Sequence, residues 1–293
     1  MKVRGLKRKK GMRLSIITIN KNNVHNLSKT LESVSAQTCR NFEHIIIDGA
    51  SSDESVSVIK KYAKNSQFQV KWISEPDSGI YNAMNKGIRM ASGDYVQFLN
   101  SGDCLANAGV VERMLSSLEE NNLPSILYGN MLKVFKDGKV LNDKCFAGRD
   151  ISFIGFYTGT LNHSSALIKR SLFEKYGFYD ESLRIVSDWK WYLNAIALGE
   201  EKPVFTDIDV TLFDMTGISE TNKVLDKAER RKVLEESIPA SILKDYDDFA
   251  FPIDQIKRLK RHPWAYKVVW LIERCLFKVE KAKIKRTGII RYQ

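Results

Sequence analysis

The segment Asn100-Ser101-Gly102-Asp103 gathers oxygen-bearing side chains directly after a short apolar run, Tyr95–Leu99. Aromatic and β-branched residues in a run bounded by glycines are typical of a buried strand. Ligands of open α/β sheets bind beyond the carboxyl ends of strands, and carboxylate and amide oxygens suit Mg²⁺ or Mn²⁺ better than zinc. We therefore expect a divalent-metal site with Asp103 as its charged ligand. The alternative is an ordinary turn after a strand.

Apolar runs and helical patterns alternate through the first hundred residues. We expect strands at about 14–19, 42–47, 69–73 and 95–99, and helices at 24–37, 54–64 and 78–91. Strands that alternate with helices in this way form parallel sheets with right-handed crossovers. The pattern therefore predicts an α/β fold with a mostly parallel, Rossmann-like sheet flanked by helices.

The first strand-to-helix turn, residues 20–24, contains no glycine. It therefore lacks the GxGxxG and P-loop arrangements, whose backbone N–H groups cradle phosphate. If the fold binds a nucleoside diphosphate, the charge of the diphosphate must be neutralised in another way. A divalent ion at the end of the fourth strand would do so, which favours Asp103 as a metal ligand.

After residue 105 the alternation breaks down. The patterns predict helices at 107–120, 172–176 and 186–198, and strands at 125–134, 139–146, 163–168 and 203–213. A mixed, aromatic-rich segment of this kind is typical of a subdomain that receives a substrate. We predict four regions: a basic tail (1–13), a nucleotide-binding half (14–104), an acceptor-binding half (105–220) and a helical, basic extension (221–293).

The positive charge of the chain is concentrated at its two ends. Of the net charge of +11, residues 1–13 contribute seven Lys or Arg residues and no acid, and residues 257–293 contribute twelve against two acids. Basic ends on an acidic body favour tails that meet an anionic surface, whereas a nucleic-acid-binding protein would carry its charge on the folded domain. Residues 263–279 mix aromatic and basic residues as a helix lying on a membrane does. Packing on the catalytic domain or on a second subunit is the alternative.

Cysteine spacing and hydropathy limit the cellular setting. The four cysteines show no CxxC spacing, which argues against a zinc site or a disulfide scaffold and fits a reducing cytoplasm. No run of about 18 apolar residues indicates a transmembrane span, and the N-terminus does not read as a signal peptide. We expect a cytoplasmic protein that is peripheral at the inner face of the membrane.

Four motifs occur in an order that resembles a known family. They are the strand end at Thr18 and Asn20, the strand end at Asp48, the segment 75–87 and the segment 100–103. Together they resemble the family 2 glycosyltransferases of the GT-A fold, especially bacterial enzymes of polysaccharide and lipopolysaccharide biosynthesis. The resemblance covers residues 13–215. Many relatives end the fourth strand with Asp-x-Asp-Asp, and two of these carboxylates are absent here.

The resemblance implies a nucleotide-sugar donor, preferably a UDP-sugar, and a Mn²⁺ or Mg²⁺ ion that Asp103 holds against its diphosphate. It also implies that Asp48 contacts the base, since a carboxylate can accept a hydrogen bond from the imide N–H of uracil. The residues that it assigns to the donor are Thr18, Asn20, Asp48, Asp77, Gly79, Asn82, Asn85, Lys86, Asn100 and Ser101.

The segment Ser187-Asp188-Trp189 resembles the acidic motif of the same family near the acceptor. Transfer to a hydroxyl requires a base, and the resemblance implies that Asp188 is this base in a single displacement that inverts the anomeric carbon. His163 and Trp189 are candidates for contacting the acceptor or the metal. A lone histidine is more often structural, and aromatic residues at helical spacing more often belong to a core.

These observations predict an inverting, metal-dependent glycosyltransferase whose acceptor is a hydroxyl of a glycan or of a lipid-linked molecule. A non-catalytic relative of the same fold is one alternative. A sugar nucleotidyltransferase is another, and it would require a glycine-rich loop after the first strand, which is missing. A basic nucleic-acid-binding protein is a more remote alternative.

Overall fold

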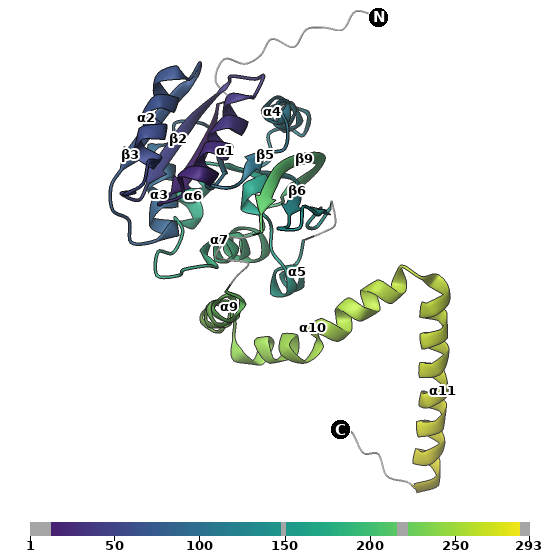
Figure 1. Cartoon of the computed structure of the whole chain (residues 1–293). Coiled ribbons are helices and arrows are strands. Elements are labelled where there is room, and N and C mark those ends of the chain that lie inside the picture. Colours follow the sequence, from purple (N-terminus) through teal and green to yellow (C-terminus); the bar gives the residue numbers. More distant parts are fainter. Residues whose placement is uncertain (1–12, 148–150, 216–221, 288–293) are drawn as a thin grey trace, which may run out of the picture. The chain divides into compact units, whose positions relative to one another are not determined.

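The computed structural model describes residues 13–147, 151–215 and 222–287 of the 293-residue chain (Figure 1). The chain divides into two compact units, one that ends at Glu236 and one that begins at Ser237. All of the predicted basic tail except Arg13 lies outside the described residues. Within the part that is described, no helix has both the length and the apolar character needed to cross a bilayer.

Four parallel strands form one half of the sheet, in the order β3-β2-β1-β4. They are β1 (Leu14–Asn20), β2 (Phe42–Asp48), β3 (Gln69–Ser74) and β4 (Tyr95–Phe98). The helices between them are α1 (Val24–Ser35), α2 (Ser55–Asn65) and α3 (Ile80–Met90). The predicted alternation of strands and helices is therefore confirmed for this half (Figure 1).

Helices cover both faces of the parallel half, which explains why β1 and β2 are buried along their whole length. Ile17 pairs with Ile45, so their side chains share one face, and Ile46 points to the other. On the first face α3 approaches closely, since a Cβ atom at Gly87 would lie 2.4 Å from Cγ2 of Ile17. On the second face α1 and α2 enclose Ile46. Each such buried isoleucine contributes about 2 kcal/mol of hydrophobic free energy.

The other half of the sheet is mainly antiparallel and continues from β4 in the order β8-β6-β9-β5. Its strands are β5 (Cys104–Leu105), β6 (Ile126–Val134), β8 (Ala166–Lys169) and β9 (Val204–Asp214), and β7 (Val140–Asp143) pairs with β6. Only the β6–β9 pair is parallel here. The helices are α4 (Val110–Glu120), α5 (Phe153–Thr158), α6 (Ser171–Tyr176) and α7 (Ser187–Tyr192). The predicted α/β class with a flanked sheet is confirmed.

Several predicted boundaries differ locally from the structure. The strand expected at 139–146 is only β7 (Val140–Asp143), and the helix expected at 107–120 begins at Val110. The strand expected at 163–168 begins at Ala166, because residues 163–165 form a short 3₁₀ turn, η1 (His163–Ser165). The helix expected at 186–198 is an α-helix only as α7 and continues as a π-helical turn, η2 (Leu193–Leu198). Wide turns of this kind occur frequently next to functional sites.

Three helices complete the chain. They are α9 (Lys223–Ser237), α10 (Ala240–Lys260) and α11 (Pro263–Thr287). The helix expected at 263–279 is therefore present and longer than predicted. α9 belongs almost wholly to the first unit and buries Glu229, Val233 and Leu234. The predicted helical character of the extension is confirmed.

Candidate active site

Strand register brings three of the predicted donor-binding residues together. Asn20 and Asp48 are paired across β1 and β2, and the Asn20 side-chain amide donates to Oδ1 of Asp48 at 2.9 Å. The hydroxyl of Ser101, which follows β4, donates to Oδ1 of Asn20 at 2.8 Å. A continuous hydrogen-bonded row therefore crosses the carboxyl ends of three strands, where ligands of such sheets bind.

Asp48 is fully buried and accepts four hydrogen bonds. The donors are the Asn20 amide, the backbone N–H and the hydroxyl of Ser51, and the hydroxyl of Ser74. Burial favours a higher pKa for this carboxyl, but these donors outweigh burial and hold the pKa of Asp48 below its ordinary value. Asp48 is therefore an anion whose carboxylate is held in place by four hydrogen bonds, and contact of this carboxylate with a nucleotide base stays a prediction.

Asp77 and Gly79 lie beside this row. A Cβ atom on Gly49 would come within 2.2 Å of Oδ2 of Asp77, so the Asp77 carboxylate lies against the backbone next to Asp48. Gly79 precedes α3 with a φ of +151°, a conformation that L side chains rarely adopt. Glycine at position 79 therefore allows α3 to begin at this edge of the sheet.

Four other predicted donor residues hold loops or strands in place. The Thr18 hydroxyl is buried between His44 and the carbonyl of Leu99. Asn82 and Asn85 both donate to the Glu181 carboxylate, and Lys86 pairs with Glu75 while donating to a backbone carbonyl. These contacts stabilise the surroundings of the row, and contact of these side chains with a donor stays a prediction.

Asp103 is buried, with 5% of its surface exposed, and lies close to a second carboxylate, that of Asp214. Its Oδ1 accepts the backbone N–H of Asp214 at 3.2 Å. Burial raises the pKa of Asp103 to about 7, with a further increase from the Asp214 charge, while the His163 charge and backbone donors lower it. Asp214, at the end of β9, was missed at first. The signal that would have identified it is an acid directly after a predicted strand.

The groups around Asp103 were tested for their fit to a divalent ion. Among the described residues, no three His, Cys, Asp or Glu side chains form a ready cluster for a metal. Mg²⁺ sites, however, commonly use one or two carboxylates, with water and substrate phosphates completing the shell. Asn100 also has a buried Oδ1 that lacks a hydrogen-bond partner in the described structure. Asp103, with Asp214 and Asn100 nearby, fits an ion of this kind.

Asp188 is linked directly to His163 and Tyr81. Nδ1 of His163 lies 2.8 Å from Oδ2 of Asp188, and the Tyr81 hydroxyl lies 2.9 Å from Oδ1. Nε2 of His163 lies 3.4 Å from the Asn100 amide nitrogen. His163 therefore lies between Asp188, the candidate base, and Asn100, which belongs to the candidate metal site. Tyr81 was not proposed from the sequence, although it lies inside the segment 75–87.

The ionisation of this pair follows from its burial and its charges. Burial favours a neutral Asp188, but the hydrogen bond and charge of His163 outweigh burial and hold the pKa of Asp188 below its ordinary value. Burial likewise acts to lower the pKa of His163, but Asp188 and the charge of Asp103 raise it overall. Asp188 is therefore ionised at neutral pH, as a proton acceptor must be.

The aromatic residues of α7 belong to the core, as their helical spacing indicated. Trp189, Trp191 and Tyr192 are 1%, 3% and 0% exposed. The Trp189 indole N–H donates to the carbonyls of Phe156 and Gly159. Almost none of the Trp189 ring is left for stacking on a sugar, so its contact with an acceptor stays a prediction.

Comparison with known proteins supplies the family. The model of glycosyl transferase family 2 matches residues 15–177. An uncharacterised glycosyltransferase of Mycobacterium tuberculosis (strain ATCC 25618 / H37Rv) is 34% identical over 208 residues, covering 70% of this chain and 76% of the relative. A PGL/p-HBAD biosynthesis glycosyltransferase of Mycobacterium bovis (strain BCG / Pasteur 1173P2) is 26% identical over 171 residues, covering 58% and 64%.

Solved structures support the fold. TarS of S. aureus, in complex with UDP-GlcNAc, has a TM-score of 0.62 at 16% identity and covers 87% of this chain and 78% of its own. The mannosyltransferase PcManGT from Pyrobaculum calidifontis, in complex with GDP-Man and Mn²⁺, has a TM-score of 0.61 at 14% identity and covers 96% and 77%. These likenesses confirm the predicted GT-A fold. Because the family model spans more than half of the chain and the tuberculosis relative is matched over most of its length, this chain belongs to glycosyl transferase family 2.

Proposed function

We propose that this family 2 glycosyltransferase uses Asp188 to move a sugar from a nucleoside diphosphate, preferably UDP, to an acceptor hydroxyl with inversion. The observation that carries the proposal is the place of His163, whose Nδ1 lies 2.8 Å from Oδ2 of Asp188 and whose Nε2 lies 3.4 Å from the amide nitrogen of Asn100. Asn100 belongs to the segment that ends at Asp103, so His163 links the proposed base to the segment of the proposed metal ligand.

The proton transfer is assigned to the Asp188 carboxylate. The acceptor oxygen bonds to the anomeric carbon, the bond from that carbon to the diphosphate breaks, and the hydroxyl proton passes to Asp188. His163, Tyr81 and the backbone N–H of Trp189 occupy three of the roughly four lone-pair positions of the carboxylate, so one position remains for the acceptor hydroxyl. Holding the carboxylate among three partners also fixes its rotamer, which the near-attack geometry requires.

Asp103, with Asp214 and Asn100, is the proposed site for Mn²⁺ or Mg²⁺. A divalent ion there would offset the charge of the departing diphosphate, which the glycine-free turn after β1 cannot cradle. The Mn²⁺ present with GDP-Man in the PcManGT structure supports this proposal. The preference for uracil depends on Asp48 and is supported by the UDP-GlcNAc complex of TarS.

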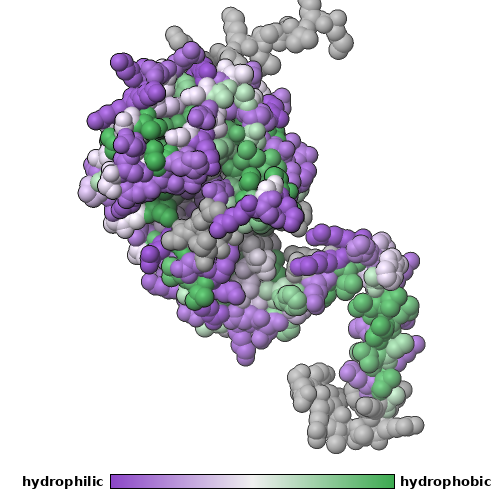
Figure 2. Space-filling model, viewed as in Figure 1, coloured by the Kyte–Doolittle hydropathy of each residue, from purple (hydrophilic) through white to green (hydrophobic). Residues whose placement is uncertain are grey.

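A glycan or a lipid-linked molecule of cell-surface polysaccharide synthesis is the proposed acceptor, and a cytoplasmic membrane surface is its proposed location. The PGL/p-HBAD biosynthesis relative gives general support. More directly, α11 exposes an apolar stripe, in which Trp264, Val268 and Leu271 are 73%, 49% and 55% exposed. Figure 2 shows hydrophobic side chains gathered along this helix. Lys267, Arg274, Lys278 and Lys281 recur at helical spacing and flank this stripe along one edge.

Such a helix fits the headgroup region of an anionic bilayer, with about 1 kcal/mol from each nearby Lys or Arg. The full chain with Trp264→Glu and Leu271→Glu should bind vesicles containing anionic lipid much more weakly than the natural chain. Val224→Glu, which changes an 82% exposed valine of α9, is the matched control. Equal flotation of all three proteins would overturn the membrane proposal.

The activity is tested with Asp188→Asn. A panel of nucleotide sugars is first screened for thermal stabilisation, and release of the nucleoside diphosphate in the presence of an added acceptor is then measured with Mn²⁺. We expect Asp188→Asn to lower kcat about 1,000-fold while donor affinity is unchanged, because general bases contribute about 100- to 10,000-fold. Asp137→Asn, in an exposed turn, is the control. Full activity of Asp188→Asn would refute the assignment of the base.

A further inference from the structure

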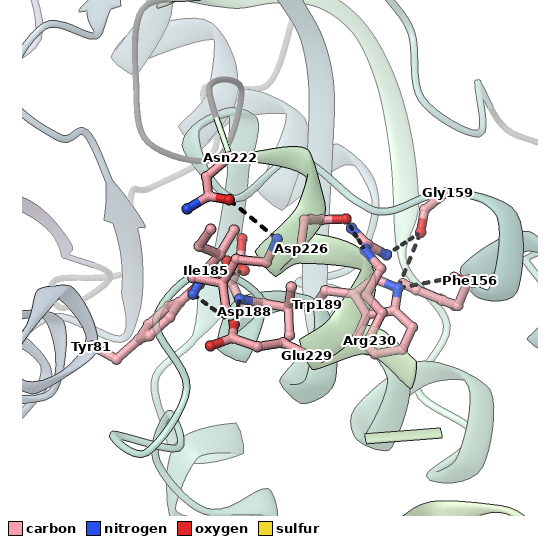
Figure 3. Close-up of polar contacts among 12 residues, drawn as sticks. Tyr81, Phe156, Gly159, Ile185, Asp188, Trp189, Asn222, Asp226, Glu229 and Arg230 are labelled. Atoms are coloured by element: carbon pink, nitrogen blue, oxygen red, sulfur yellow. Dashed lines mark hydrogen bonds and ion pairs between the residues drawn. The ribbon is translucent and has the colours of Figure 1, made fainter. Parts of the chain in front are cut away.

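The helix α9 brings a carboxylate to the backbone that leads into Asp188. Glu229 is only 9% exposed. Its two oxygens accept the backbone N–H groups of Arg184 at 2.7 Å, Ile185 at 2.9 Å and Val186 at 3.3 Å (Figure 3). One side chain thus satisfies three consecutive donors just before α7. Ile185 and Val186 are buried, so leaving either of their N–H groups unpaired would cost about 1–3 kcal/mol.

The same backbone segment is held from its other side by α3. The Tyr81 hydroxyl donates to the carbonyl of Ile185 and contacts Asp188. Ile185 is therefore fixed at its N–H by Glu229 and at its carbonyl by Tyr81, as Figure 3 shows. Only two residues separate Ile185 from the Asp188 side chain, so little freedom remains for the carboxylate to shift.

The next residue of α9, Arg230, holds the residue that follows Asp188. The Arg230 guanidinium lies 4.6 Å from the centre of the Trp189 ring and donates to the carbonyl of Gly159 at 3.3 Å. Its Nε donates to Asp226 at 3.1 Å, which sets the direction of the side chain. The Trp189 indole donates to the same Gly159 carbonyl. Because the Arg230 side chain is partly exposed, its guanidinium over the indole contributes about 1 kcal/mol.

We propose that Glu229 and Arg230 are positioning residues for Asp188. Glu229 holds the backbone that precedes Asp188 and Arg230 holds Trp189, which follows it, so that α9 helps to fix the proposed base. This inference rests on the proposed role of Asp188. Both residues, like Asp188, lie beyond the segment matched by the family model, which ends at residue 177.

The primary test is Glu229→Gln in the full chain. Glutamine keeps the shape but replaces one acceptor oxygen with an N–H₂ group, which repels the backbone N–H groups it faces. We expect kcat to fall about 10- to 100-fold with unchanged donor affinity, because displacements near 1 Å cost rates of this order. Glu235→Gln is the matched control, since Glu235 is exposed on the same helix and pairs only with Arg231 in the described structure. The control should keep wild-type kcat.

A double-mutant cycle separates positioning from general loosening of the fold. If Glu229 acts through Asp188, adding Glu229→Gln to Asp188→Asn should lower kcat no further. Full additivity, or a wild-type kcat for Glu229→Gln, would overturn the proposal. If Asp188→Asn itself is fully active, the proposed base fails instead, and the two failures are thereby distinguished.

Arg230→Lys provides a second measurement if Glu229→Gln does not fold. Lysine keeps the charge over Trp189 but cannot form the forked contacts to Asp226 and Gly159. We expect about a 5-fold loss in kcat, a loss of more than 10-fold for Arg230→Ala, and unchanged donor affinity in both. Wild-type kcat in Arg230→Ala would count against positioning from this side.

Discussion

The two halves of the sheet hold their polar residues in different ways. In the parallel half, Asn20, Asp48 and Ser101 lie at the ends of neighbouring strands and bond to one another, so strand register alone assembles them. In the antiparallel half, Asp188 is held by side chains remote in sequence, such as Tyr81, which is 107 residues away. Changes in the parallel half should therefore cost stability or donor affinity, whereas changes around Asp188 should cost turnover.

Among the changes that test this comparison, the largest effect on binding is expected where the two halves meet, at Asp103 and Asp214. Asp103→Asn removes a charged oxygen, and we expect Mn²⁺ and donor affinity to fall about 100-fold, with about 10-fold for Asp214→Asn. Mn²⁺ binding is measured by electron paramagnetic resonance without substrate, and donor binding by calorimetry. Unchanged Mn²⁺ binding in both variants would show that Asp103 and Asp214 do not bind the ion. The ion would then not lie where the two halves of the sheet meet.

Glu43 tests whether the parallel half is primarily structural. Its buried carboxylate pairs with Lys71 at 2.8 Å and accepts hydrogen bonds from Ser15 and Ser92. Glu43→Gln leaves Lys71 without its anion, and because Lys71 is partly exposed we expect a loss of about 2 kcal/mol in the free energy of unfolding. Denaturant titration measures this loss. The kcat of the folded variant should be unchanged, and a large fall in kcat would break the comparison.

The pH dependence of stability should report the same carboxylate. Burial acts to raise the pKa of Glu43, but Lys71 and the serine donors lower it from 4.5 to about 2. Since the unfolded chain binds the proton more tightly, the stabilisation is complete above about pH 4.5 and is lost as pH falls towards 2. Glu43→Gln should flatten the stability curve in this range, and equal slopes for the two proteins would contradict the assignment.

Two tyrosines of the parallel half test the same comparison, because Tyr81 on α3 reaches Asp188 whereas Tyr62 on α2 contacts His44. Tyr81→Phe removes a hydroxyl from Asp188, and we expect kcat to fall about 10-fold, since a hydrogen bond to a charged group contributes about 1.5–3 kcal/mol. Tyr62→Phe removes a hydroxyl that lies 2.7 Å from Nδ1 of His44 in the parallel half. It should lower stability by about 1 kcal/mol and leave kcat unchanged. Similar kinetic losses in both variants would remove the distinction between the halves.

The smallest effect is expected at Asp48. Asp48→Asn keeps the size of the side chain but lacks the charge that accepts from Ser51, Ser74 and Asn20. We expect about a 5-fold loss of UDP affinity, equal to about 1 kcal/mol, with kcat unchanged at saturating donor. Calorimetry with UDP and with GDP measures the loss and its base preference. Equal losses for both nucleotides would argue against base recognition by Asp48.

Most of the parallel half could be predicted because its signals are local. Apolar runs marked β1 to β4, and polar residues at the strand ends marked the row that includes Asn20 and Asp48. Prediction was weaker for side-chain direction. The amide of Asn85, which the resemblance assigns to the donor, is bonded to Tyr179 and Glu181, and its contact with a donor stays a prediction. The pattern of α3 alone does not show which of its polar residues turn inward.

In the antiparallel half the sequence indicated Asp188 and His163 as separate candidates. No sequence pattern predicted that the two side chains contact each other, or that residues of α9 bind the backbone next to Asp188. Glu229 reads in the sequence as one more exposed acid on a charged helix.

The sequence by itself determined the family, the alternating strands and the positions of the candidate acids, because periodicity and strand-end chemistry act over a few residues. Only the tertiary structure decided that His163 lies between Asp188 and Asn100 and that Asp214 contacts Asp103. It also decided that Glu229 binds the backbone just before Asp188. These contacts join segments that are 25 to 111 residues apart in the chain. Their formation depends on how a mixed sheet and its helices pack, which no local pattern encodes.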